Sequence, residues 1–199
     1  MYSADGADAR AEKLDRALEA ARTALEIDGN SRPSVIALAI AALGRGDHEA
    51  FHRTVARAAA LEPAHPAVMI DVGYLHIVAG EAERGLGLLD AGAALIYRAP
   101  TFMHVGYALG YLQIHRYDLA LREGLRIDFA DWPFAQLVKI AAVAKGDRPE
   151  VAARELLHMR KFYPDLETRA PQWLTRAQLA PGAEAAVRAG LAAAGLELR

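Results

Sequence analysis

The sequence predicts an all-α fold of stacked helical hairpins, and three observations support this prediction. Short breaks between helix-like segments recur near Gly46, Gly80, His115 and Gly146, which lie 34, 35 and 31 residues apart. Alanine, the strongest helix former, supplies much of the 53% of hydrophobic residues. Val, Ile and Thr do not alternate with polar residues over any long stretch, as they would in strands. Arrays of this kind present an extended surface to a partner.

Apolar periodicity and helix punctuation together predict eleven helices. Leu18, Ala21 and Leu25 form an apolar stripe at helical spacing, and Gly29 after them suits a left-handed cap. Pro149 falls in a first turn, where its missing N–H costs little. The expected ranges are 7–27, 31–43, 47–61, 66–79, 82–97, 100–115, 117–127, 131–145, 149–163, 166–178 and 182–194.

The expected organisation is a disordered polar tail at 1–6, a repeat array at 7–164 and capping helices at 165–199. We expect the tail segment 180–196 to pack its alanine face on the last hairpin, with Arg188 facing water, because the end of an array must be covered to stay soluble.

Composition narrows the range of partners and compartments. The 199 residues include no cysteine, which excludes disulfides and thiolate metal sites. The net charge is -2 and the pI is near 6.4, so the chain lacks the overall positive charge that is typical of nucleic-acid-binding proteins. No run of eighteen apolar residues and no signal-peptide core is present, so we expect a cytoplasmic protein that does not span a membrane.

Several segments match a known repeat pattern in order and spacing. Segment 58–63 (AAALEP) has its second-helix ending, Gly73 and Gly80 occupy its small-residue and turn positions, and 116–121 (RYDLAL) has its second-helix start. In these features the chain resembles tetratricopeptide (TPR) repeats, although Gly85 stands where alanine is usual. The resemblance implies a right-handed superhelix of about five helical hairpins with a C-terminal helical cap.

The C-terminal half carries a narrower resemblance. Its segments 125–127 (LRI), Trp132, 156–157 (LL), 163–165 (YPD) and 190–196 (GLAAAGL) follow one another in a characteristic order. They are similar to the C-terminal TPR regions of bacterial class III adenylate cyclases and winged-helix transcription activators. This resemblance implies the sensing or partner-binding part of a bacterial signalling or transcription regulator, or a free-standing relative of it.

The TPR resemblance also implies that the first helix of each hairpin lines a concave groove. The other faces of these helices are apolar as well, and a helix apolar all round must be covered on all sides. Three alternatives follow for this groove. It binds an apolar partner, or it is filled by a segment of the protein itself or by a second subunit, or the superhelix closes over itself. The expected groove residues are Ile36, Ile40, Ile70, Tyr74, Ile77, Phe102, Val105, Leu109, Leu112, Gln136 and Ile140.

We therefore expect a non-enzymatic binding or regulatory module without a cofactor. Its expected partner is a protein, a peptide or a small apolar ligand. One alternative is a self-associating structural scaffold in which the same surface makes a homodimer. We expect no contact with nucleic acid or membrane.

A second alternative is a zinc-dependent hydrolase, because segment 48–52 (HEAFH) is a literal H-E-x-x-H string. On a helix His48 and His52 share one face and would ligate zinc, with Glu49 as the general base. However, the helix register already explains Phe51 as a core residue, and no third ligand can be identified. We expect Glu49 to be exposed, with no catalytic residue and no metal ligand in the chain.

Two further histidines fall on first helices of adjacent hairpins. His76 and His104 would approach each other near Tyr74, Tyr107 and Tyr111. Such a group is either a hydrogen-bonded part of the core or a ligand contact.

Overall fold

The computed structural model describes residues 4–61, 65–129 and 131–198, and side chains from residue 15 onward together with that of Glu12. Within these ranges the chain is all α-helical, with eleven helices and no strand. It forms two compact units that meet between Val72 and Gly73, within one helix. None of the described helices combines the length and apolar content needed to cross a membrane.

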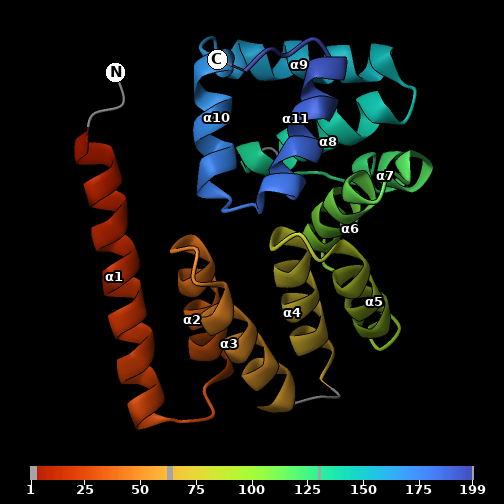
Figure 1. Ribbon diagram of the computed structural model, residues 1–199. Coiled ribbons are helices and arrows are strands. Elements are labelled where there is room, and N and C mark those ends of the chain that lie inside the picture. The colour runs from red at the N-terminus through yellow and green to blue at the C-terminus, as the bar shows by residue number, and fades with distance from the viewer. Residues whose placement is uncertain (1–3, 62–64, 130, 199) are drawn as a thin grey trace. The chain divides into compact units, whose positions relative to one another are not determined.

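The first unit contains α1 (Ala4–Ile27), α2 (Arg32–Gly44), α3 (His48–Leu61) and the first part of α4 (Pro66–Val78) (Figure 1). Helix α2 packs against both α1 and α3. It is apolar on most sides and is buried accordingly, whereas α3 is amphipathic and buries one stripe. The apolar helix α2 is thus packed on two sides, by α1 and by α3.

The second unit is centred on α6 and α8. Helix α6 packs against α5, α7, α8 and α11, and α8 packs against α6, α7, α9, α10 and α11. The helices that complete this unit after α4 are α5 (Ala82–Ala93), α6 (Phe102–Gln113), α7 (Tyr117–Gly124), α8 (Pro133–Lys145), α9 (Pro149–Phe162), α10 (Leu166–Arg176) and α11 (Pro181–Ala193).

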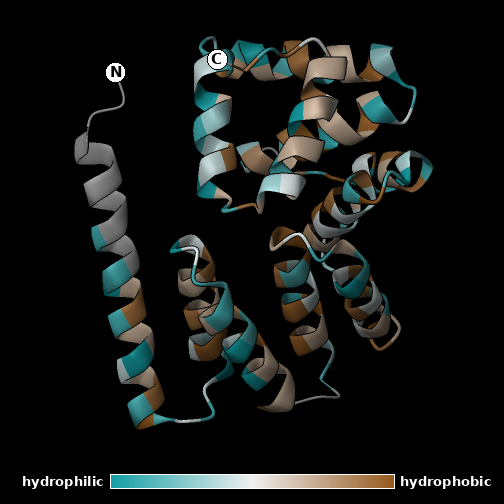
Figure 2. Ribbon diagram, in the orientation of Figure 1, coloured by the Kyte–Doolittle hydropathy of each residue, from teal (hydrophilic) through white to brown (hydrophobic). Residues whose placement is uncertain are grey.

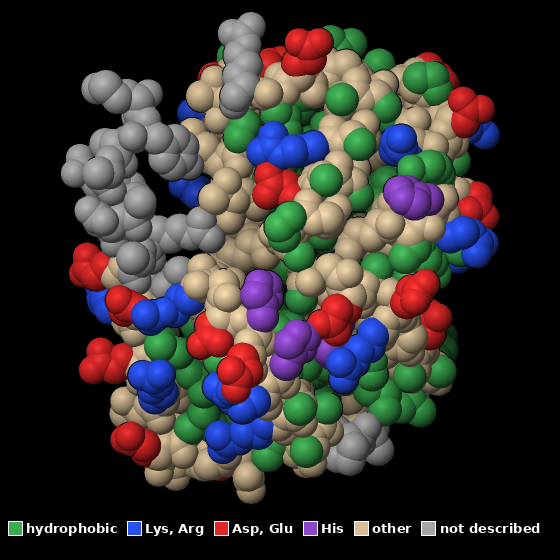
Figure 3. All heavy atoms as spheres, in the orientation of Figure 1, with side chains coloured by type: hydrophobic (Ala, Val, Ile, Leu, Met, Phe, Trp, Pro, Cys, Tyr) green, Lys and Arg blue, Asp and Glu red, His purple; other side chains and the backbone are tan. Residues whose placement is uncertain are grey.

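Burial differs between the two helices of the hairpin α8–α9. Helix α8 buries consecutive residues at 137–138 and 140–143, so every side of it is covered. Helix α9 buries only the stripe of Ala152, Leu156 and Met159, at helical spacing. Figure 2 shows the mixture of hydrophobic and hydrophilic residues along these helices, and Figure 3 shows acidic and basic side chains interspersed on one face of the molecule.

Left-handed residues end four of the helices at nearly regular intervals. Gly46 and Gly80 have φ of 72° and 89°, and His115 and Asp147 adopt the same conformation with φ of 58° and 63°. They follow α2, α4, α6 and α8 and lie 34, 35 and 32 residues apart. The first three turns are made by residues named in the sequence pattern, namely Gly46, Gly80 and His115. The fourth turn is made by Asp147, the residue after Gly146.

The same hydrogen bond accompanies each of these turns. The N–H after the left-handed residue donates to the carbonyl five residues earlier, for example Glu81 to His76 at 2.8 Å and Arg116 to Tyr111 at 3.0 Å. This is the Schellman arrangement, which satisfies carbonyls left open at a helix end. The expectation of a left-handed Gly29 was wrong, because only Gly46, Gly80 and Gly195 have positive φ among the described glycines.

All eleven expected helices are present, with differences at their ends. Helix α1 already begins at Ala4, inside the expected disordered tail, whose residues 1–3 lie outside the described residues. Helix α5 ends at Ala93 and not at Tyr97, whose side chain is fully exposed. Apolar periodicity continues past Ala93 in the sequence, but none of the described residues covers Tyr97, so the helix gains little from extension.

Candidate functional site

Most of the expected groove residues are core residues in this structure. Val105, Leu109, Ile77 and Ile140 are fully buried, as is Leu112. These side chains are therefore covered by other parts of the chain, and the binding role of the surface that they form stays a prediction. Of the remaining positions, Ile70 is buried, Ile40 is exposed, and four are half-buried, namely Ile36, Tyr74, Phe102 and Gln136.

Close helix contacts explain this burial on the α4 and α5 side of α6. A Cβ atom at Gly106 would lie 3.1 Å from the Tyr74 ring, and one at Gly110 would lie 2.9 Å from Leu86. The missing side chains let α6 approach its neighbours closely. Tyr74 also meets Phe102 edge-to-face at 6.3 Å between ring centroids, so the structure does bring these two predicted residues together.

Helix α11 packs on both α6 and α8. Val187 and Leu191 on α11 are fully buried, and a Cβ atom at Gly190 would lie only 2.6 Å from the Cβ of Ala141 on α8. Just before α11, the Ala180 N–H donates to the Val78 carbonyl at 2.8 Å, which ties the start of this helix to the end of α4. The protein's own C-terminal helix thus runs from the end of α4 across α6 and α8.

The expectation for the tail was correct in part. The alanine-rich α11 does pack on α8 of the last hairpin, but it also packs on α6. Arg188 is only partly exposed and donates to Glu184 at 2.7 Å along the same helix. An open hollow of about 460 Å³ lies beside the start of α11, with Gly80, Gln113 and Gly182 among its lining residues.

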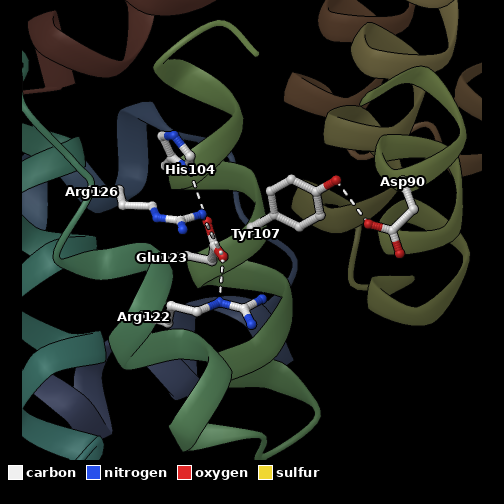
Figure 4. Close-up of polar contacts among 6 residues, drawn as sticks. All are labelled: Asp90, His104, Tyr107, Arg122, Glu123 and Arg126. Carbon is white, nitrogen blue, oxygen red and sulfur yellow. Dashed lines mark hydrogen bonds and ion pairs between the residues drawn. The ribbon is translucent and has the colours of Figure 1, made fainter. Parts of the chain in front are cut away.

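A buried carboxylate joins α6 to α7. Glu123 is 4% exposed, and its Oε2 accepts a hydrogen bond from His104 Nδ1 at 2.8 Å (Figure 4). Its Oε1 accepts from Arg122 Nε at 3.0 Å and lies 3.5 Å from an Arg126 guanidinium nitrogen. A buried charge is tolerated when such partners replace water. With both oxygens engaged, Glu123 is suited to hold two helices together and not to act as a free base.

Tyr107 on α6 contacts α5 and its neighbour Tyr111. The Tyr107 hydroxyl donates to Asp90 Oδ1 at 2.8 Å, and its ring stacks on Tyr111 with centroids 6.0 Å apart. Burial, followed by the bond to Asp90, raises the pKa of Tyr107 above its usual range. Burial also raises the pKa of Tyr111. Both phenols therefore remain neutral hydrogen-bonding groups near neutral pH.

The predicted group of histidines and tyrosines divides into separate contacts. His76 is 1% exposed, and its Nδ1 lies 2.9 Å from Glu81 Oε2, whereas His104 is held by Glu123. Tyr74 contacts Phe102. Each of these histidines thus lies beside a carboxylate of its own.

The H-E-x-x-H string lies at the start of α3. Asp47 caps this helix by accepting a hydrogen bond from the Ala50 N–H at 2.9 Å. As expected, Glu49 is exposed in the first turn, where it pairs with Arg53, and Phe51 is fully buried. Among the described residues, no three His, Cys, Asp or Glu side chains come together in a way that would hold a metal ion.

Sequence reasoning missed Glu123, Arg122, Arg126 and Asp90. The spacing of Glu123 and Arg126, at i and i+3 within the helix expected at 117–127, was a local signal for an ion pair. The contacts to His104 and Tyr107 had no such signal, because they depend on how α5, α6 and α7 pack.

Comparison of the chain with protein-family models, with curated proteins and with solved structures finds no match.

Proposed function

We propose that this chain is a non-enzymatic binding or regulatory module, built as a TPR-like right-handed superhelix of about five helical hairpins. Two features support the proposal: the left-handed turns after α2, α4, α6 and α8 at 34, 35 and 32 residues, and the greater burial of α8 relative to α9. The resemblance of the C-terminal half further favours a role within a bacterial signalling or transcription regulator.

The observation that carries the proposal is the position of α11 on α6 and α8. In a TPR-like array these two are first helices, and the layer that they form is the one that receives a partner. Here that layer already holds a helix, bound through Ala183, Val187 and Leu191 at helical spacing. The function that we propose is therefore to receive an amphipathic helix of a protein or peptide partner, which takes the place of α11.

A full-chain variant that detaches α11 tests this function. Gly190→Leu places a side chain where even a Cβ atom would lie 2.6 Å from Ala141. We expect this variant to bind a fluorescent synthetic peptide of residues 180–196 in a saturable manner, while the parent chain binds it weakly because α11 competes. Ala189→Leu, at an exposed position of the same helix, is the control and should behave like the parent.

Two results would contradict the proposal. A folded Gly190→Leu variant that does not bind the peptide would show that the surface under α11 is not a receptor for a helix. Equal binding by the parent and by both variants would show that the peptide binds elsewhere.

A self-associating scaffold is the second candidate, and one observation favours it. Gln178, in the short link between α10 and α11, has a left-handed φ of 56° although it is not glycine. This conformation is strained, and strain in a hinge favours exchange of the following helix between two copies. The molar mass in solution separates the candidates: a dimer that dissociates in Gln178→Gly would support exchange, and a monomer at all concentrations would exclude it.

A further inference from the structure

One side of α9 carries an exposed stripe in which apolar and basic residues alternate. Arg154, Leu157, His158, Lys161 and Phe162 recur at spacings of three and four residues and are all exposed. We call this set the outer stripe of α9. Leu157 and Phe162 are 60% and 67% exposed, so two large apolar side chains of one helix face solvent. The stripe spans about 12 Å, or roughly two helical turns.

The two permanent cations of the outer stripe have no carboxylate partner in the part of the chain that the structure describes. Among the described residues, neither Arg154 nor Lys161 has an ion-pair partner, whereas Arg160 on the same helix pairs with Glu167 at 2.8 Å. Of the acidic residues of α9, Glu155 lies outside the stripe and pairs with Lys139 of α8, whereas the exposed Glu150 lies one turn before Arg154. The stripe itself carries two permanent cations and no acidic side chain, although the whole chain has a net charge of -2.

The surface around the outer stripe is hollowed. Arg154, Leu157, His158 and Lys161 line an open hollow of about 500 Å³, together with Arg160. The His158 and Phe162 rings meet at 5.1 Å between centroids and form one end of the stripe. Leu157 thus lies between the cations of Arg154 and Lys161 along the helix. This arrangement suits a ligand that carries an apolar side chain between two acidic groups.

We propose that the outer stripe of α9 is a docking site for an acidic amphipathic helix of a partner protein. Leu157 and Phe162 contact the apolar residues of that helix, and Arg154 and Lys161 pair with its carboxylates. The stripe lies on the side of α9 opposite Ala152, Leu156 and Met159, the residues buried toward α8. It is thus a second surface, distinct from the layer covered by α11.

Charge and size favour a protein segment over a membrane or a nucleic acid. Anionic membranes are recognised by clusters of about four to eight basic residues, and nucleic acids by larger basic faces. The outer stripe has two permanent cations, and the net charge of -2 opposes long-range attraction to a polyanion. An amphipathic helix needs only a few anchors at spacings of three to four residues, which the stripe supplies.

A displayed library of random 16-residue peptides, selected on the purified full chain, tests the proposal. We expect the enriched peptides to combine acidic residues with apolar residues at helical spacing. The double variant Arg154→Glu with Lys161→Glu should weaken binding of a selected peptide by about tenfold, because two attractive pairs become repulsive. The same variant should bind better to that peptide when its acidic residues are replaced by lysine.

Matched controls come from the same unit. Arg98→Glu with Arg176→Glu reverses two exposed cations elsewhere and should leave peptide binding unchanged. Leu157→Ser should weaken binding, while Leu125→Ser, at a similarly exposed leucine, should not. Circular dichroism should show that all variants keep the helical content of the parent, since every changed side chain is exposed.

Three outcomes would overturn the proposal. The first is enrichment of peptides without acidic residues, and the second is equal loss of binding in the two charge-reversal variants. The third is flotation of the chain with vesicles of phosphatidylserine and phosphatidylcholine that depends on Arg154 and Lys161 while no peptide is enriched. Because none of these assays involves α11, failure here is distinguishable from failure of the proposed function.

Discussion

Gly73 on α4 and Gly85 on α5 form a backbone-to-backbone contact. A Cβ atom at Gly73 would lie 2.8 Å from the Gly85 carbonyl oxygen, and one at Gly85 would lie 2.5 Å from the Gly73 carbonyl oxygen. Real Cβ atoms do not approach backbone oxygens so closely, so both positions require glycine. The small-residue position that the TPR resemblance assigns to Gly73 is thus a close contact between helices, and the unusual Gly85 is its partner.

Filling this contact should destabilise the fold. We expect Gly73→Leu to lower the free energy of unfolding by roughly 1–3 kcal/mol, because the new side chain must push α4 and α5 apart. Urea denaturation followed by circular dichroism measures the change. Gly87→Ala is the control: its Cβ meets nothing within 4 Å, and alanine should stabilise α5 by about 0.5–1 kcal/mol. Equal stability of Gly73→Leu and the parent would rule out the contact.

Removing the charge of Glu123 should loosen the connection between α6 and α7. We expect Glu123→Gln to lower the free energy of unfolding by about 1–3 kcal/mol, since the buried site loses its charge-assisted hydrogen bonds. Glu83→Gln, at an exposed position of α5, should change it by less than about 0.5 kcal/mol. If the two variants are equally stable in urea denaturation, the pairs with His104, Arg122 and Arg126 contribute nothing to the fold.

Alkaline pH should destabilise the protein in part through Tyr74. Burial raises the pKa of this phenol above its usual range, so the folded chain favours the protonated form. The stabilisation is present below the unfolded pKa, about 10, and is lost as pH rises from there toward the folded pKa. Tyr74→Phe should therefore lose less stability than the parent between pH 8 and pH 10.5 in urea denaturation.

The fully exposed Tyr97 provides the control for this measurement. Tyr97→Phe should retain the pH dependence of the parent, because the phenol that it removes is fully exposed. If Tyr74→Phe shows the parental pH dependence as well, another group causes the alkaline loss.

The H-E-x-x-H string should prove to be unrelated to zinc. We expect the double variant His48→Ala with His52→Ala to keep the melting temperature and oligomeric state of the parent, because both side chains are exposed. Elemental analysis of protein purified without added metal should find no stoichiometric zinc. Zinc at one equivalent in the parent and its loss in the double variant would instead support the hydrolase alternative.

The positions of the helices followed from local chemistry that can be seen in the sequence. Pro149 begins α9 as expected, and Gly46 and Gly80 make the left-handed turns after α2 and α4. The exceptions show the limit of local reasoning: Asp147 takes the left-handed turn beside Gly146, and Gly29 does not take one. Local preferences predict the position of a helix end to within one or two residues, but the surrounding packing selects the residue that adopts the left-handed conformation.

By itself, the sequence determined that the chain is helical, where its helices lie, and that α2, α4, α6 and α8 are too apolar to stand alone. Only the tertiary structure decided what covers them. Val105 and Leu109 are buried while Ile40 is exposed, and α11 lies across α6 and α8. The pairing of Glu123 with His104 was likewise invisible, because the two residues are 19 positions apart on different helices. Periodicity shows that an apolar face must be buried, whereas the occupant of that face depends on contacts between segments that are distant in sequence.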